Sequence, residues 1–388
     1  MNPATFRRNR KFGFAAALLT VFWLPAFPAV AAQMVGLGKV LTAPGGGQIF
    51  GFDVDQNGDD GVLASAASGG IAVSTFDQDT AKITRTLSKN VGPDSEYIVD
   101  GIFAGDVALL THEVTPNGKL YAKRFYKVMN PVTGEKFTGA WTPPLKDVDV
   151  QLVAENQQSQ PSVVFVIELK NQDKPDLIVS DIATNTFDNV IPLDPNLFGL
   201  GNGPQLGQYA AANEAALALS PDGGEVGGAA PINVLVDLSS GKTTQFNGYN
   251  NGPYGSGYVN GMAVDPNTGI SATTTELNAQ VEFYNLANKT GVNAVQLPCT
   301  GSADQYYSGA GIAVDPVNKL FLVTETYDAC SGGQDGVVAV YDETGNFIES
   351  ITGFQFAIGE PAPAINPGKR TGWAFGGKGF SQLQQFFY

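Results

Sequence analysis

The stretches Gly261-Met262-Ala263-Val264-Asp265-Pro266 and Gly311-Ile312-Ala313-Val314-Asp315-Pro316 decide the fold of this chain. Each is a short apolar run that ends in Asp-Pro, and further short apolar runs separated by turn residues follow it. The two copies lie fifty residues apart. A repeat of this length made only of strands is typical of a β-propeller, in which each repeat forms one blade.

Related landmarks occur along the rest of the chain, at positions 55, 105, 155, 220, 265, 315 and 366. The landmark at 220 is Ser220-Pro221, which follows the apolar run 216–219. Seven landmarks predict an all-β protein, a propeller of about seven blades with four antiparallel strands each. The blade at 315 shows four candidate strands, 310–314, 320–324, 337–341 and 347–351.

The last landmark leaves room for three strands only, at 362–365, 371–375 and 382–388. We therefore expect residues 34–41 to supply the fourth strand of that blade and to close the ring, which removes exposed sheet edges. No linker separates a second domain, so the sequence predicts a single propeller over residues 32–388.

The N-terminal residues have the pattern of an export signal. A basic segment holds Arg7, Arg8, Arg10 and Lys11, an apolar stretch covers 12–27, and Ala29-Val30-Ala31 provides a small-residue cleavage site. The sequence thus predicts a signal peptide over 1–31 and a periplasmic or extracellular mature protein. The alternative is a retained membrane anchor, although the uninterrupted apolar run is shorter than the ~20 residues that a spanning helix needs.

The chain is acidic, with a net charge of −15 that becomes −19 when the four basic residues of 1–31 are removed. Such a charge argues against nucleic acid and anionic membrane surfaces as partners. It is compatible with cation binding or with plain solubility. We expect a monomer whose mature chain does not span a membrane.

The chain has two cysteines, Cys299 and Cys330. In an exported protein they predict one disulfide, because both fall in connections at the same end of the blade at 315. Two unpaired thiols are the alternative.

The chain contains the strand sequences "GIAVDP", "LFLVTET", "VVAVYD" and "GNFIESI", and the strand and turn sequence "VNGMAVDPNTG". Together these sequences resemble the NHL/YVTN-type superfamily of secreted β-propellers. The resemblance is specific in the blades at 265 and 315. Because that superfamily contains scaffolds, ligand binders and unrelated enzymes, the resemblance implies an architecture and leaves the chemistry open.

The segment 53–61, Asp-Val-Asp-Gln-Asn-Gly-Asp-Asp-Gly, shares several positions with an EF-hand calcium loop. Position twelve of that loop needs a bidentate Glu and is Ala64 here. The segment also takes the place of a turn between two strands. Two interpretations stay open: a plain acidic turn, or a turn that binds Ca²⁺ weakly through Asp53, Asp55, Asn57 and Asp59.

Familiar catalytic signatures are absent from the sequence. His112 is the only histidine, so metal centres built from several histidines are excluded, and no G-x-S-x-G, P-loop or H-E-x-x-H motif occurs.

Polar residues recur at one end of the predicted blades. The ends of the second strands carry His112, Glu168, Glu276, Glu325 and Lys378, and the starts of the innermost strands carry Asp100, Glu214, Asn260 and Glu360. Carboxylates and an amide around the channel mouth could bind a small ligand or Ca²⁺, which takes ~6–8 oxygen ligands. A solvated rim of charges is the alternative.

The loops at the same end are rich in tyrosine, with Tyr254 and Tyr258 before the blade at 265 and Tyr306 and Tyr307 before the blade at 315. Tyrosine combines an apolar ring with a hydroxyl at small entropic cost, which suits sugar, peptide or protein surfaces.

Two functions follow. The first is an exported, non-catalytic propeller that presents this tyrosine-rich face to a protein, glycan or small-molecule partner. The second rests on a resemblance: Asn260-Gly261-Met262-Ala263, and more faintly Glu360-Pro361, resemble segments of the gluconolactonase/senescence-marker family. That resemblance implies a metal-dependent hydrolase of lactones or esters, with Ca²⁺ at the channel mouth. Ala310 stands where the family has an Asp ligand, so we favour the binding protein.

Overall fold

The structure is a computed structural model of the 388-residue chain. It describes residues 35–56, 58–68, 70–90, 102–103, 106–114, 120–129, 138–141, 150–156, 163–170, 174–181, 186–193, 205–209, 214–219, 232–247, 259–275, 280–297, 311–325, 336–359 and 362–388. The chain divides into two compact units, Met1–Gln33 and Met34–Tyr388. The predicted signal peptide lies outside the described residues, and all that follows concerns the second unit.

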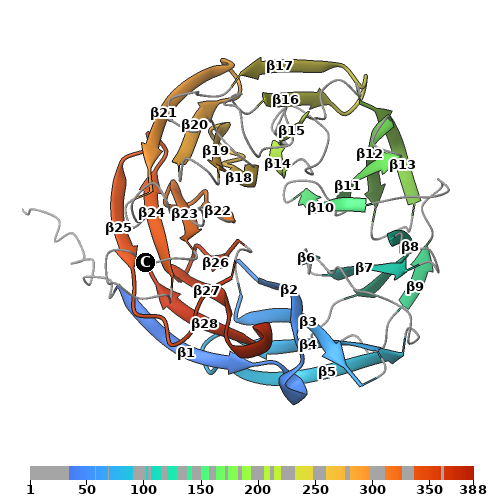
Figure 1. Cartoon of the computed structure of the whole chain (residues 1–388), viewed down its shortest axis with the longest axis vertical. Coiled ribbons are helices and arrows are strands. Elements are labelled where there is room, and N and C mark those ends of the chain that lie inside the picture. Colours follow the sequence, from blue (N-terminus) through green and yellow to red (C-terminus); the bar gives the residue numbers. More distant parts are fainter. Residues whose placement is uncertain are drawn as a thin grey trace, which may run out of the picture. The chain divides into compact units, whose positions relative to one another are not determined.

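The strands of the described residues form seven four-stranded antiparallel sheets, with neighbouring strands side by side (Figure 1). The first three sheets contain β2 (Ile49–Val54), β3 (Asp60–Ala67), β4 (Gly70–Asp77) and β5 (Lys82–Asn90); β6 (Ile102–Phe103), β7 (Asp106–Val114), β8 (Leu120–Met129) and β9 (Thr138–Trp141); and β10 (Val150–Asn156), β11 (Val163–Lys170), β12 (Lys174–Asp181) and β13 (Thr186–Pro192).

The next three contain β14 (Gln205–Tyr209), β15 (Glu214–Leu219), β16 (Ile232–Asp237) and β17 (Thr243–Asn247); β18 (Val259–Val264), β19 (Ile270–Thr275), β20 (Gln280–Asn285) and β21 (Thr290–Gln296); and β22 (Ile312–Asp315), β23 (Leu320–Glu325), β24 (Val337–Asp342) and β25 (Phe347–Ile351). The strands of the β22–β25 sheet confirm those predicted for the blade at 315.

The seventh sheet joins the two ends of the described chain. Its order is β1 (Gly36–Thr42), β28 (Gln382–Phe387), β27 (Thr371–Gly376) and β26 (Ala364–Asn366). Strand β1 pairs antiparallel with β28, with Leu41 opposite Leu383 (Figure 1). This confirms the expected pairing of the N-terminal strand with the last strand of the chain.

The first strands of successive sheets contact one another. The contacting pairs are β2 with β6, β6 with β10, β10 with β14, β14 with β18, β18 with β22, β22 with β26, and β26 with β2. In each sheet the turns after the first and third strands share one end, which we call the turn end. The opposite end carries the second-to-third turns and the connections between sheets, and we call it the loop end.

The sequence located six of the seven first strands and misplaced one. Residues 216–219 were expected in an innermost strand before Ser220-Pro221, but they lie in β15, the second strand of its sheet. The first strand is β14, whose sequence Gln-Leu-Gly-Gln-Tyr holds only one aliphatic residue. Because β14 lacks the apolar run that marks the other first strands, sequence periodicity could not find it.

The core lies between neighbouring sheets, where strand alternation brings apolar side chains together. Phe283 of β20 meets Phe321 of β23 edge-on, with ring centroids 5.6 Å apart. Trp373 of β27 meets Phe76 of β4 in the same way at 5.1 Å. In the part of the chain that the structure describes, no helix has the length and hydropathy needed to cross a membrane.

Candidate functional site

The aspartates of the Asp-Pro landmarks are fully buried and hold their own turns. One carboxylate oxygen of Asp265 accepts a hydrogen bond from the Asn267 backbone N–H at 2.7 Å. Asp315 accepts from the backbone N–H groups of Val317 and Asn318 at 3.0 and 2.8 Å. A carboxylate used in this way forms an Asx turn, so these landmark residues have a structural role.

The turns after the third strands are built in the same way. The Asp77 carboxylate accepts from the backbone N–H and the hydroxyl of Thr80, and these bonds lower the pKa of Asp77. Hydrogen bonds from Ser239 and Ser240 lower the pKa of Asp237 to about 2. A sequence scan would offer these carboxylates as metal ligands, but at the turn end they accept hydrogen bonds that hold the turns.

Side-chain amides at the turn end also link one sheet to the next. The Asn267 amide donates to the Pro316 carbonyl at 3.4 Å, and the Asn318 amide donates to the Pro367 carbonyl at 3.3 Å. The Asn366 amide donates to the Asp55 carbonyl at 3.0 Å. Three successive junctions, ending with the one between β26–β27 and β2–β3, thus use the same type of bond.

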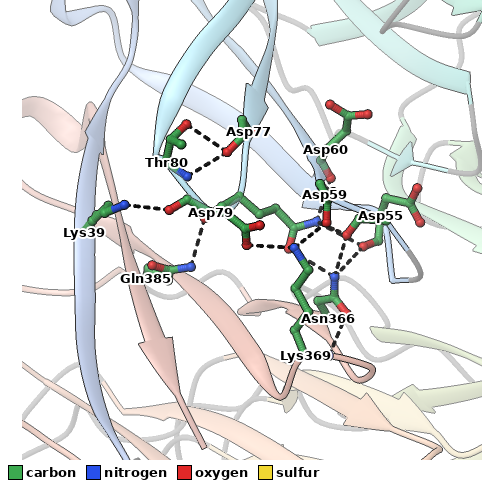
Figure 2. Close-up of polar contacts among 12 residues, drawn as sticks. Lys39, Asp55, Asp59, Asp60, Asp77, Asp79, Thr80, Asn366, Lys369 and Gln385 are labelled. Carbon is green, nitrogen blue, oxygen red and sulfur yellow. Dashed lines mark hydrogen bonds and ion pairs between the residues drawn. The ribbon is translucent and has the colours of Figure 1, made fainter.

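The acidic turn at 53–61 lies at the last of these junctions (Figure 2). The Nζ atom of Lys369 lies 2.5 Å from a carboxylate oxygen of Asp59 and 2.8 Å from one of Asp79. The buried Gln78 amide donates to the carbonyls of Asp55, Gly58 and Asp60. Burial, with nearby Asp55, Asp77 and Asp59, raises the pKa of Asp60.

Among the predicted calcium ligands of this turn, Asp59 is thus ion-paired with Lys369. Asp53 accepts a hydrogen bond from the Val54 backbone N–H, and Asn57 lies outside the described residues. The described residues hold no group of three or more His, Cys, Asp or Glu side chains placed to bind a metal. Weak Ca²⁺ binding at this turn stays a prediction.

The loop-end residues predicted from the sequence are only partly described. Glu325 ends β23, Asn260 is half-buried in β18, and His112 belongs to β7. Glu214 is half-buried at the start of β15, at the turn end and not at the start of an innermost strand as expected. Glu168 lies in β11, and Lys378 begins a short 3-10 helix, Lys378–Phe380. The remaining candidates lie outside the described residues: Asp100, Glu276, Glu360, Tyr254, Tyr258, Tyr306, Tyr307, Cys299 and Cys330.

Glu325 does not belong to a solvated rim. Its side chain is fully buried and lies on the same strand face as Phe321 and Val323, which pack with Phe283 of β20. Burial, together with the charge of Glu325, raises the pKa of Tyr341. This carboxylate therefore lies inside the layer between the β18–β21 and β22–β25 sheets.

Sequence reasoning missed a second polar region, between the β14–β17 and β18–β21 sheets. It contains Asn233, Ser271, Thr273, Gln280 and Glu282, all buried. We call this set the polar layer. The alternation of polar and apolar residues in β20 was its only sequence signal, and that pattern is typical of a strand with one face in water.

Comparisons with known proteins identify the fold. No family model and no curated protein matches the chain. Among solved structures, a chain of "Crystal Structure of Mitotic Checkpoint Complex" is similar with a TM-score of 0.60 and 13% identity, over 98% of this chain and 99% of that one.

Two further similar structures are "Crystal structure of RRP9 WD40 repeats" and "Structure of Dos1 propeller". The first has a TM-score of 0.64 and 10% identity over 91% of this chain and 98% of that one. The second has a TM-score of 0.57 and 12% identity over 91% and 95%. At these identities the likeness concerns the fold alone, which is that of a β-propeller. Neither the NHL/YVTN type nor the lactonase family appears among these neighbours.

Proposed function

We propose that this chain is an exported, seven-bladed β-propeller that binds a protein partner through its loop end. The seven four-stranded sheets and the succession of contacts between their first strands support a ring. The pairing of β1 with β28 supports closure by the N-terminal strand. The predicted signal peptide over 1–31 is the basis for export.

We choose the loop end as the binding face because the polar groups at the turn end are already used within the protein. There, Asp77, Asp237, Asp315 and Asp342 hold their own turns, and amides link neighbouring sheets. These groups already have partners. The loop end instead receives the long connections 248–258 and 298–310, which carry the tyrosines predicted to bind.

A protein is the favoured partner class. Propellers offer a broad surface of loops on a rigid scaffold, and Tyr254, Tyr258, Tyr306 and Tyr307 would supply amphipathic contact area. The structure titled as a mitotic checkpoint complex comes from a protein assembly. The net charge of −15 favours a partner with a neutral or basic surface over nucleic acid.

The test compares loop-end and turn-end variants in one binding experiment. Partners are isolated by cross-linking and identified by mass spectrometry. The purified partner is then titrated against the wild type, a Tyr254→Ser/Tyr306→Ser variant and a Val317→Ser control. Val317 is 70% exposed in a turn at the opposite end. We expect the double variant to weaken binding at least tenfold and the control to bind like the wild type. Equal loss in the control, or binding to glycans only, would contradict the proposal.

The lactonase alternative gains no support from the neighbouring structures. The resemblance to lactonases rests on the segments that begin at Asn260 and Glu360. Asn260 lies in β18, next to an irregularity in the pairing with β19, and Glu360 lies outside the described residues. Metal analysis followed by a panel of lactones and esters tests it directly. Turnover that depends on Asn260 would replace the binding function.

A further inference from the structure

Two equivalent positions meet wherever neighbouring sheets join at the turn end. One is the landmark residue after a first strand, and the other is the residue that follows the third strand of the next sheet. In three successive junctions these positions hold the pairs Asp265 with Glu343, Asp315 with Tyr388, and Asn366 with Gln78. The pairs are equivalent in position but differ in chemistry.

Two of these junctions combine a hydrogen-bond donor with an acceptor. The Tyr388 hydroxyl donates to Oδ2 of Asp315 at 2.9 Å. The Asn366 amide donates to Oε1 of Gln78 at 3.3 Å. All four side chains are buried. A phenol and an amide keep their hydrogens at neutral pH, so both bonds persist there.

The third junction contains two carboxyl groups. One oxygen of the fully buried Asp265 accepts from the Asn267 backbone N–H, and Oδ2 has no hydrogen-bond partner in the described part of the chain. The Glu343 carboxyl lies close enough to Asp265 to share a hydrogen bond. Because ionised carboxylates only accept hydrogen bonds, this pair can form the bond of the other junctions only when it holds a proton.

Further bonds hold the turn 343–346, which carries Glu343, against the β18–β21 sheet. The Thr268 hydroxyl donates to Oε1 of Glu343 at 2.6 Å. The Asn293 amide donates to the Thr344 carbonyl at 3.1 Å. These bonds keep the two carboxyl groups neighbours, so their repulsion acts directly on the contact between the sheets.

The charges around the pair do not offset this repulsion. The surrounding turns 266–269, 316–319 and 343–346, with the adjoining strand ends, add Lys319, Asp342 and Asp315. The Lys319 Nζ atom lies 3.8 Å from Oε2 of Glu343, but its side chain is 65% exposed and screened by water. Asp342 accepts bonds within its own turn, and Asp315 accepts from Tyr388. Burial, and then the Glu343 carboxyl, raise the pKa of Asp265 to about 6.

We propose that Asp265 and Glu343 form a pH-dependent contact between the β18–β21 and β22–β25 sheets, closed by one shared proton and weakened when that proton is lost to solvent. The folded pKa lies above the ordinary value of 3.8, so the contribution is complete below about pH 4 and is lost as the pH rises through 6. The other two junctions described above have no such dependence.

The experiment measures hydrogen–deuterium exchange of the full mature chain by mass spectrometry, at pH 4.5 and 7.5 in EDTA. Peptides covering 265–270 and 342–347 report the pair, and peptides covering 382–388 report the Asp315–Tyr388 junction. Glu343→Gln and Asp265→Asn each replace one carboxyl by an amide that donates to the other. The matched control is Glu349→Gln, since Glu349 is also half-buried in the same sheet.

Rates are compared between proteins at one pH, which cancels the intrinsic effect of pH on exchange. At pH 7.5 we expect the wild type to exchange at least about fivefold faster than Glu343→Gln and Asp265→Asn in the peptides that report the pair. At pH 4.5 the three should agree. Glu349→Gln should follow the wild type at both values, and peptides 382–388 should not distinguish the proteins.

Four results would overturn the proposal. Equal rates in the wild type and Glu343→Gln at pH 7.5 would show that the pair has no effect. Slower exchange in Asp265→Asn alone would assign the effect to the burial of Asp265 without its neighbour. Slower exchange in Glu349→Gln would indicate a general effect of charge. Protection of the wild type by added Mg²⁺ or Ca²⁺ at pH 7.5, absent in Glu343→Gln, would make a cation the bridging group.

Discussion

At the scale of single residues, Asp265 and Asp315 occupy the same position of the landmark, but their carboxylates have different hydrogen-bond partners. The Oδ2 atom of Asp315 accepts hydrogen bonds from the Tyr388 hydroxyl and the Asn318 amide. The Oδ2 atom of Asp265 has no hydrogen-bond partner in the described part of the chain. Burial and the neighbouring carboxyl of Glu343 raise the pKa of Asp265 to about 6. The difference comes from the neighbouring sheets, since the local sequences are nearly the same.

We predict that Asp265→Asn changes how stability depends on pH. The folded pKa of about 6 lies above the ordinary value of 3.8, so Asp265 favours the folded state below pH 4, and this contribution is lost as the pH rises through 6. Asparagine keeps the acceptor for the Asn267 N–H group without the buried charge. At pH 8 the variant should be about 1–3 kcal/mol more stable than the wild type, and at pH 4 the two should be equal.

Urea unfolding at pH 4, 6 and 8 measures this effect, with Asp315→Asn as the control. That control loses charge-assisted bonds from Tyr388 and Asn318 and should be destabilised at pH 8. The prediction fails if the two variants respond alike to pH.

At the scale of elements, the repeated turns determine how the sheets meet. Asn267 and Asn318 follow the first strand of a sheet, and Asn366 ends one. Each donates to a carbonyl in the corresponding turn of the next sheet. The junction between the last and first sheets adds the ion pairs of Lys369 with Asp59 and Asp79. These exposed pairs contribute little by themselves, so the amide bonds and the apolar layers are the main determinants.

The predicted disulfide belongs to this scale, and its cysteines lie outside the described residues. Cys299 and Cys330 fall in the connections before β22 and after β23 and are thirty-one residues apart. We expect them to form a disulfide in the oxidised protein, which stabilises it by on the order of 3 kcal/mol in the chain-entropy model. Peptide mapping without a reducing agent should recover one linked pair. Free thiols in the purified exported protein would contradict this.

At the scale of the whole molecule, β1 and β28 bring residues more than 340 positions apart into one sheet. Leu41 of β1 is 3% exposed and packs with Trp373 and Leu383. The last sheet therefore needs β1 to cover its core and its edge.

We predict that Leu41→Ala destabilises the protein by about 2–4 kcal/mol, as expected for a large-to-small change in a core. Thr42→Ala, at the exposed neighbouring position, should change stability by less than about 0.5 kcal/mol. Denaturant midpoints measure both. If Leu41→Ala proves neutral, β1 does not contribute to the last sheet in solution.

The sequence by itself determined the strand repeat, the fold class and the pairing of the terminal strands, because strand alternation and Asp, Asn, Pro and Gly turns act locally. It failed at β14, where the apolar run is too short to mark a first strand. It also could not foresee that Glu325 is buried, that Lys369 pairs with Asp59, or that the polar layer forms between two sheets. Those features depend on which side chains of neighbouring sheets face each other, and only the tertiary structure decides that.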